Sequence, residues 1–324
     1  MQLLMLVLLA VAPPVAFLVY ILRRDRVEPE PLGLVLKMLF LGCLSVIPAM
    51  VMELLFTDLP LFNGTGIAGS ALKSFLLVAP VEEAVKLLTV LLFVWRNENF
   101  DQRGDGIVYT GTVAIGFAMA ENLMYVLGRG WLIGVLRAVT SIPSHTFTGV
   151  LMGCFVGAAK FASNRKDRAR FLVTGFLVAW LFHGAYNTFA LSGTAAALLV
   201  VPLVIALFML GSRSIRKNMV ISGGREKAVP AAPVKAGAAR RARRWHKVAG
   251  RTLLVLSGIF WVLVGLGLLL DDMDSREAFH VILGTMVLTA VPFSLGIILE
   301  IAHRRRARSM RVEGVCERDG TSSG

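Results

Sequence analysis

The chain has 324 residues, of which 56% are hydrophobic, and its formal net charge is +13. Its mean hydropathy of +0.70 and its uncharged blocks, such as residues 196–210 and 252–270, exclude an ordinary soluble domain. The basic residues stand beside the ends of these blocks, which argues against nucleic acid as a partner. The three cysteines have no CxxC spacing and predict neither a disulfide framework nor a thiolate zinc site.

The apolar blocks predict transmembrane helices. A segment of about 20 apolar residues matches the hydrocarbon thickness of a bilayer. Lipid offers the backbone no hydrogen-bond partner, so such a segment must bond to itself as a helix. We therefore predict an all-α, polytopic transmembrane helix bundle of about nine spans, with the lipid bilayer as its partner.

The spans follow one another through the chain with a regular distribution of charge. Met1–Leu22 has no basic residue before its apolar stretch, which predicts a retained span with its N-terminus outside. Lysine and arginine gather in the connections 23–32, 96–105, 160–170 and 211–251 and after residue 302, whereas the intervening connections hold Arg129 and Arg276. This alternation predicts an N-out, C-in topology. The predicted spans are 2–22, 33–56, 70–95, 106–127, 131–160, 171–192, 194–211, 252–270 and 278–302.

The same pattern predicts four regions. We expect residues 1–211 to form a seven-span membrane body. Residues 212–251 are rich in proline, alanine and glycine and are basic, which predicts a flexible cytoplasmic linker attracted to anionic lipid. A two-span hairpin at 252–302 and a cytoplasmic tail at 303–324 complete the chain.

Charged residues interrupt the third predicted span. Such residues cost roughly 2.5–3.5 kcal/mol each at the bilayer centre and indicate a functional site by default. Glu82 and Glu83 precede Lys86 by four and three residues, so on a helix Lys86 can pair with either carboxylate. Pro80 removes a backbone hydrogen bond beside them. A carboxylate here can act as a general base on water; the alternative is an ion pair that only joins two helices.

The next three spans also carry polar residues. Each of these residues alone could be a packing residue in an interhelical hydrogen bond. His183 and Asn187 are four apart and therefore share a helix face, and Arg137 is expected to pair with a carboxylate because it keeps its charge. Their occurrence in successive spans predicts one buried cluster. The residues are Glu121 and Asn122 in the fourth span, Arg137 and His145 in the fifth, and His183 and Asn187 in the sixth.

This set of side chains fits hydrolysis by an activated water. His145, His183 and a carboxylate could bind Zn²⁺ through three ligands and leave a fourth position open. We assign Glu121 as that carboxylate, with a role in orienting a histidine as the alternative. A second carboxylate would accept a proton from the water. Asn122 or Asn187 could donate to the developing oxyanion.

The motifs resemble those of the PrsW family of intramembrane proteases, within the CAAX-protease and bacteriocin-processing superfamily. They are EExxK at 82–86, FxxxEN at 117–122, the histidine at 145 and HxxxN at 183–187. The resemblance covers roughly residues 20–210. The CAAX branch has EExxxR in its first motif and a histidine where this chain has Glu121, which favours the PrsW branch over a protease for prenylated proteins.

The resemblance implies a multi-pass metallopeptidase of the bacterial plasma membrane. Its expected substrate is a membrane-anchored protein, such as an anti-sigma factor that receives its first cut. The resemblance implies catalytic roles for Glu82 and Glu83 and site roles for His145, His183 and Asn187, while Glu121 and Asn122 occupy a further motif.

A transporter or channel is the leading alternative, in which the Glu/His cluster forms a proton or cation path. A transporter or channel would have ionisable residues along a translocation route or in a repeated half of the chain. The sequence shows neither pattern. A non-catalytic membrane scaffold is disfavoured by the energetic cost of so many buried charges.

Overall fold

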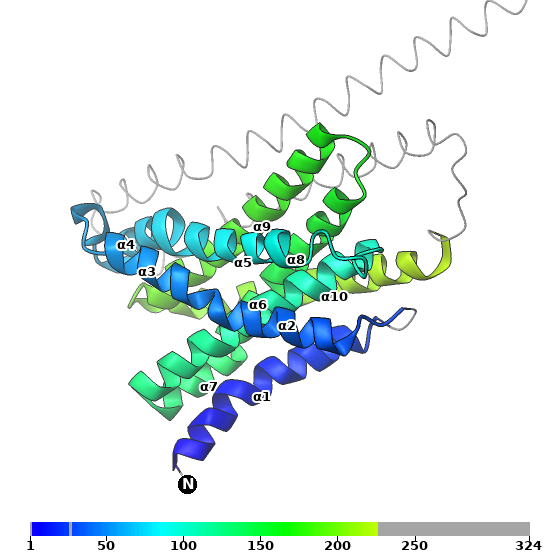
Figure 1. The fold of residues 1–324 in the computed structure, drawn as a ribbon. Helices are drawn as coiled ribbons and strands as arrows, with labels where there is room; N and C mark the ends of the chain where they lie inside the picture. The colour runs from blue at the N-terminus through cyan, green and yellow to red at the C-terminus, as the bar shows by residue number, and fades with distance from the viewer. Residues whose placement is uncertain (1, 26–27, 226–324) are drawn as a thin grey trace, which may run out of the picture. The chain divides into compact units, whose positions relative to one another are not determined.

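The computed structural model describes residues 2–25 and 28–225, all of which belong to one compact unit. These residues form helices and no strands (Figure 1), which confirms the predicted all-α class. The helices are α1 (Gln2–Leu22), α2 (Leu32–Leu44), α3 (Val46–Phe56), η1 (Pro60–Phe62), α4 (Gly66–Lys73), η2 (Ser74–Val78), α5 (Ala79–Phe93), α6 (Arg103–Arg129), α7 (Trp131–Val139), α8 (Ser141–Lys160), α9 (Arg165–Leu191), η3 (Ala195–Leu199) and α10 (Val200–Arg225).

Five helical segments of the described chain are long and apolar enough to cross a membrane. They are Leu32–Phe56, Arg103–Arg129, Trp131–Lys160, Arg165–Leu191 and Ala195–Met219. Each of them overlaps a predicted span. A shorter apolar stretch, Leu6–Leu22, lies within α1. The predicted spans at 252–270 and 278–302 and the tail at 303–324 lie outside the described residues, so the count of nine and the N-out, C-in topology stay predictions.

The third predicted span, 70–95, is divided into three helical pieces. The α-helices α4 and α5 are separated by η2, a π-helical turn. Pro80 stands at the start of α5, where its missing N–H prevents a regular continuation of the preceding helix. This turn places the EExxK motif in the first two turns of a new helix.

Helix α8 lies at the centre of the bundle, with all its residues from Ser141 to Ala159 buried. The glycines of α8 allow its backbone to come into direct contact with the backbone of α6. A Cβ atom on Gly153 would lie 2.4 Å from the carbonyl oxygen of Gly106, and one on Gly157 would lie 2.1 Å from the carbonyl oxygen of Arg103. Small residues four apart are a common device for close helix packing in membranes.

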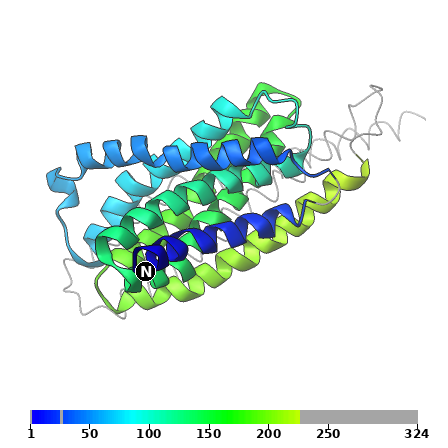
Figure 2. The same cartoon turned by 60° about the horizontal axis from the view of Figure 1, so that its bottom comes forward.

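The other helices surround this pair. Helices α1 and α2 pack against α6, and α9 and α10 pack against α8. In the view of Figure 2, α6 and α8 lie between α2 and α3 on one side and α1 and α10 on the other. The outer helices expose large apolar side chains, including Leu55, Leu92 and Leu198, as expected for surfaces that face lipid.

The predicted boundary at residue 211 falls inside a helix, because α10 continues to Arg225. Ser212, Ile215 and Met219 are buried, so one face of the helix continues to pack against the bundle. The Tyr20 hydroxyl of α1 also donates to Ser212 Oγ at 3.2 Å. Residues 212–225 of the predicted linker are therefore helical, and the rest of it, from 226 onward, lies outside the described residues.

Candidate active site

Polar residues from four helices meet in one buried cluster inside the apolar bundle. Helix α5 provides two glutamates and a lysine, α6 a glutamate, and α8 and α9 one histidine each. At most 5% of any of their side chains is exposed, except that of Glu121, at 15%. The residues are Glu82, Glu83, Lys86, Glu121, His145 and His183.

The Lys86 ammonium lies at the centre of this cluster. Its Nζ donates to Glu82 Oε2 at 3.3 Å and to Glu83 Oε1 at 2.8 Å, as the helical spacing predicts. It also lies 3.0 Å from His145 Nδ1 and 4.2 Å from the centre of the Phe117 ring. An ammonium has donors only, so His145 Nδ1 must be the acceptor.

This contact fixes the orientation of the His145 ring. With Nδ1 accepting, the ring proton is on Nε2, which faces Glu121 Oε2 at 3.0 Å. Arg137 Nη2 lies 2.8 Å from the same oxygen, which confirms the predicted pairing of Arg137 with a carboxylate. Arg137 Nε also donates to Asn122 Oδ1 at 3.3 Å. Glu121 is thus held between a histidine and an arginine.

His183 has a carboxylate of its own. Its Nδ1 lies 2.8 Å from Glu83 Oε1. That oxygen also accepts from Lys86, so Nδ1 carries the ring proton and donates. His183 Nε2 is left to accept from Asn187 Nδ2 at 3.1 Å, and it lies 3.8 Å from Glu82 Oε2. The His145 and His183 rings meet edge to face with their centres 4.7 Å apart.

Glu82, His145 and His183 form a group that can hold a metal ion. Each offers one ligand atom, and these atoms lie within 4.8 Å of one another. Two imidazole nitrogens and one glutamate oxygen are a known ligand set of catalytic zinc, which leaves a fourth position open. The sequence predicts Glu121 as the carboxylate ligand, but the carboxylate of this group is Glu82, because Arg137 and His145 Nε2 engage Glu121.

The charges of the cluster also fit a bound cation. Three carboxylates, those of Glu82, Glu83 and Glu121, face two basic side chains, Lys86 and Arg137. The formal balance is one negative charge in a buried site, where uncompensated charge is costly. A metal cation would offset this charge.

Glu53 belongs to the surroundings of the site but was not among the predicted residues. It lies on the same face of α3 as Val46 and Ala49, which pack against Phe117, and it interacts electrostatically with Glu121 and Lys86. In the sequence, Glu53 is a single glutamate within an apolar span. It therefore meets the criterion that identified Glu82 and Glu121, which is an ionisable residue inside a predicted transmembrane helix.

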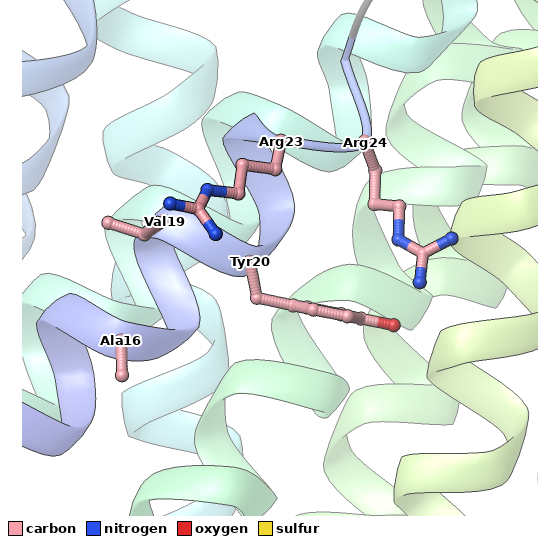
Figure 3. A pocket seen from close by; sticks show the side chains of 5 residues that line it. All are labelled: Ala16, Val19, Tyr20, Arg23 and Arg24. Carbon is pink, nitrogen blue, oxygen red and sulfur yellow. The ribbon is translucent and has the colours of Figure 1, made fainter.

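A surface pocket at the end of α1 is separate from this cluster. It has a volume of about 390 Å³ and is lined by Ala16, Val19, Tyr20, Arg23 and Arg24 (Figure 3). None of these residues is a histidine or a carboxylate, so the pocket lacks groups suited to activating water.

The fold and the site together define a polytopic membrane protein with a buried glutamate–histidine centre of the kind that activates water. The model of the PrsW family of intramembrane metalloproteases matches residues 30–211, a range that contains the whole cluster. The chain belongs to this family, which confirms the resemblance seen in its motifs.

Curated relatives agree with this assignment. Protease PrsW of Geobacillus kaustophilus is 36% identical over 229 residues, which are 70% of this chain and 96% of the relative. Protease PrsW of Bacillus subtilis is 31% identical over 207 residues, 64% of this chain and 92% of the relative. Protease PrsW of Clostridioides difficile is 29% identical over 219 residues, 66% and 91% of the two chains. No solved structure shows a significant match. These findings support a bacterial membrane-embedded protease and give no support to the transporter alternative.

Proposed function

We propose that the chain is an endopeptidase that cleaves a membrane-anchored protein at the centre formed by Glu82, His145 and His183. The observation that carries this proposal is the convergence of these three donors within 4.8 Å of one another in a buried site. Family membership supports hydrolysis of a peptide bond as the reaction. The alternation of basic connections supports a multi-pass, N-out and C-in orientation in the plasma membrane.

The proposed cofactor is Zn²⁺, which when bound supplies Lewis-acid activation of a water. Glu82, His145 and His183 would hold it. Glu83 and Glu121 each face the second nitrogen of one of the histidines, at 2.8 and 3.0 Å. Carboxylates in such positions fix the tautomer and the orientation of ligating imidazoles.

We assign proton transfer to Glu83. Its Oε1 is engaged by Lys86 and His183, whereas its Oε2 is buried without a hydrogen-bond partner among the described residues. This oxygen is thus available to accept a proton from water, and Lys86 stabilises the carboxylate through Oε1. Asn187 Nδ2 lies beside His183 Nε2 at 3.1 Å and is the proposed donor to negative charge on the carbonyl oxygen. Asn122 has a buried Nδ2 without a partner in the described chain and is the second candidate.

The proposed substrate is an anti-sigma factor with one membrane span and a small extracytoplasmic region, on which the enzyme makes the first cut. The resemblance to the PrsW family supports this choice. A buried site suits such a substrate, because only a peptide that enters the bundle can reach Glu82 and His183.

The proposal is tested with single-span anti-sigma factor reporters tagged at both ends. Each reporter is produced with the wild-type chain, Glu82→Gln, His183→Ala or the control Glu98→Gln, in a bacterium without its own PrsW protease. Glu98 is exposed, so its variant should cleave as the wild type does. Glu82→Gln and His183→Ala should leave the reporters intact at equal protein levels. Cleavage by both of these variants would show that the catalytic assignment is wrong.

Metal content is measured on the same purified proteins by elemental mass spectrometry. We expect about one zinc per chain in the wild type and loss of zinc from His145→Ala and His183→Ala. A wild-type protein that cleaves the reporter without bound metal would refute the zinc assignment and leave the peptidase assignment in place.

A further inference from the structure

The pocket at the end of α1 has a charged part and an apolar part. Its volume of about 390 Å³ lies within the range of small-molecule sites. Arg23 and Arg24 line one part of it. Ala16 and Val19 line the other and are exposed on the preceding turns of the helix. In Figure 3 the Arg23 side chain extends toward Val19, and that of Arg24 extends toward the hydroxyl end of Tyr20. The pocket can therefore accept a molecule in which an anionic group is joined to an apolar one.

The charged part is suited to a phosphate group. A guanidinium presents its N–H donors in a planar fork that matches a pair of phosphate oxygens. No carboxylate is among the described residues that line the pocket. The next residue in the chain, Asp25, accepts a hydrogen bond from the Glu30 N–H through Oδ2 at 3.3 Å. The pocket thus presents two arginines, and no acidic group, to an anion.

The place of the pocket along α1 indicates a lipid as the source of this anion. The apolar stretch Leu6–Leu22 ends immediately before the two arginines, so the pocket lies where hydrocarbon gives way to headgroups. Basic pockets at this depth beside transmembrane helices bind anionic lipid headgroups. Ala16 and Val19 lie on the hydrocarbon side, where an acyl chain can pack on them. A free phosphate would gain nothing from these two residues.

Tyr20 connects the pocket to α10. Its hydroxyl donates to Ser212 Oγ of that helix at 3.2 Å. The Arg24 guanidinium lies over the Tyr20 ring, 5.3 Å from its centre. The turns of α10 that follow Ser212 add positive charge at this end of the bundle. Their exposed basic residues are Arg213, Arg216 and Lys217.

We propose that the pocket binds the headgroup phosphate of an anionic phospholipid, with an acyl chain along Ala16 and Val19. Arg23 and Arg24 donate to the phosphate. Because Arg24 also rests on Tyr20, the bound lipid stabilises the end of α1 beside α10. The pocket is separate from the glutamate–histidine cluster, so this inference does not depend on the proposed function.

Native mass spectrometry of the full chain, purified in detergent and freed of lipid, tests the site. The probe is phosphatidylglycerol, and zwitterionic phosphatidylcholine and inorganic phosphate are the comparisons. We expect the wild type to bind phosphatidylglycerol more tightly than phosphatidylcholine. Arg23→Gln/Arg24→Gln should bind phosphatidylglycerol about 10- to 30-fold more weakly, the effect of two basic residues at a lipid surface. Ala16→Phe, which fills the apolar part of the pocket, should also weaken this binding.

The matched control is Arg165→Gln/Lys166→Gln, which removes two exposed basic side chains at the start of α9. It should bind phosphatidylglycerol as the wild type does. An equal loss in this control would mean general attraction to a basic surface and would overturn the site. Displacement of the lipid by inorganic phosphate at comparable concentration, or unchanged binding in Ala16→Phe, would show that the pocket takes no acyl chain and would overturn the lipid assignment.

Thermal unfolding separates lipid binding from a purely structural role. Arginines near the C-terminus of a helix also offset its dipole, and this effect needs no lipid. We expect phosphatidylglycerol to raise the unfolding midpoint of the wild type by mass action, and to raise that of Arg23→Gln/Arg24→Gln clearly less. An equal rise in both proteins would refute the site. Unchanged lipid binding together with slower cleavage of the reporter in the double variant would assign the pocket to the substrate chain and would also overturn the proposal.

Discussion

The Nδ1 atom of His183 lies 2.8 Å from Oε1 of Glu83, although 100 positions separate the two residues in the chain. The contact joins α9 to α5, and the same oxygen accepts a hydrogen bond from Lys86. It leaves the Nε2 atom of His183 directed toward Asn187 and Glu82. A single carboxylate oxygen thus determines which nitrogen of His183 is available at the centre of the site.

The first prediction concerns this contact. In Glu83→Gln the imidazole loses its carboxylate, and we expect zinc affinity to fall by about 10- to 100-fold, as is usual when such a partner is removed. Competition with a chromogenic zinc chelator measures the affinity in detergent. Glu98→Gln is the control, at an exposed glutamate. Equal affinity of Glu83→Gln and wild type would contradict the orienting role.

The second prediction concerns Lys86, which is fully buried between two carboxylates. Lys86→Met leaves both carboxylates buried without this partner, a change that costs about 3–5 kcal/mol in folded proteins. We expect a large decrease in the midpoint of thermal unfolding in detergent. Lys37→Met, at an exposed lysine of α2, should unfold near the wild-type temperature. A Lys86→Met protein as stable as this control would show that the ion pair contributes little to the fold.

The third prediction concerns the contact between α6 and α8. Gly153→Ala would place a methyl group 2.4 Å from the carbonyl oxygen of Gly106, so the two helices must separate. Overpacking of this kind costs about 1–3 kcal/mol. Gly128→Ala is the matched control, because a Cβ atom at that position of α6 meets nothing within 4 Å. Thermal unfolding of the two variants should differ clearly, and equal midpoints would refute backbone contact at Gly153.

The fourth prediction concerns Glu30, in the connection between α1 and α2. Burial raises the pKa of Glu30 from 4.5 to about 9, with Asp105 acting in the same direction and the hydrogen bond from Tyr109 opposing it. The folded protein therefore binds more protons than the unfolded chain between these two pH values. As a result, Glu30 lowers the stability progressively as the pH rises from about 4.5 to about 9.

Glu30→Gln removes this titration while keeping a side-chain oxygen that can accept from Tyr109. We expect its thermal midpoint to exceed that of wild type by an amount that grows from pH 5 toward pH 9. The comparison is made in one detergent at constant ionic strength, with Glu98→Gln in parallel. If the difference between Glu30→Gln and wild type does not change with pH, the raised pKa is wrong.

The sequence predicted the helical class and the convergence of the polar motifs well, because each depends on local patterns. Apolar blocks specify helices in lipid, and the cost of charge in such blocks points to contacts between them. The pairing of Lys86 with Glu82 and Glu83 follows from helical spacing alone. The pairing of Arg137 with a carboxylate follows from its permanent charge.

Contacts that depend on how helices are placed against one another could not be predicted in this way. The approach of Lys86 to His145 depends on how α8 is placed along α5. The placement of the helices also decides that Glu82, and not Glu121, joins the two histidines in the group that could hold a metal ion. Pro80 indicated a loosened helix, but the hydrogen bond from Trp180 Nε1 to the Phe75 carbonyl joins residues that are 105 positions apart in the chain. The continuation of α10 beyond residue 211 depends on packing against the bundle. This packing could not be predicted, because the composition of the chain changes at this point.

The complete burial of α8 has a consequence for how the bilayer acts on the enzyme. All residues of the helix from Ser141 to Ala159 are buried, so its surroundings are formed by the other helices of the bundle. Thicker or thinner bilayers press on the exposed apolar faces of outer helices such as α2, α3 and α10, and such mechanical effects reach His145 through the helices that pack against α8, chiefly α6, α9 and α10. His145, the histidine on α8 that we propose for the active site, thus lies in surroundings that the protein carries with it from one membrane to another.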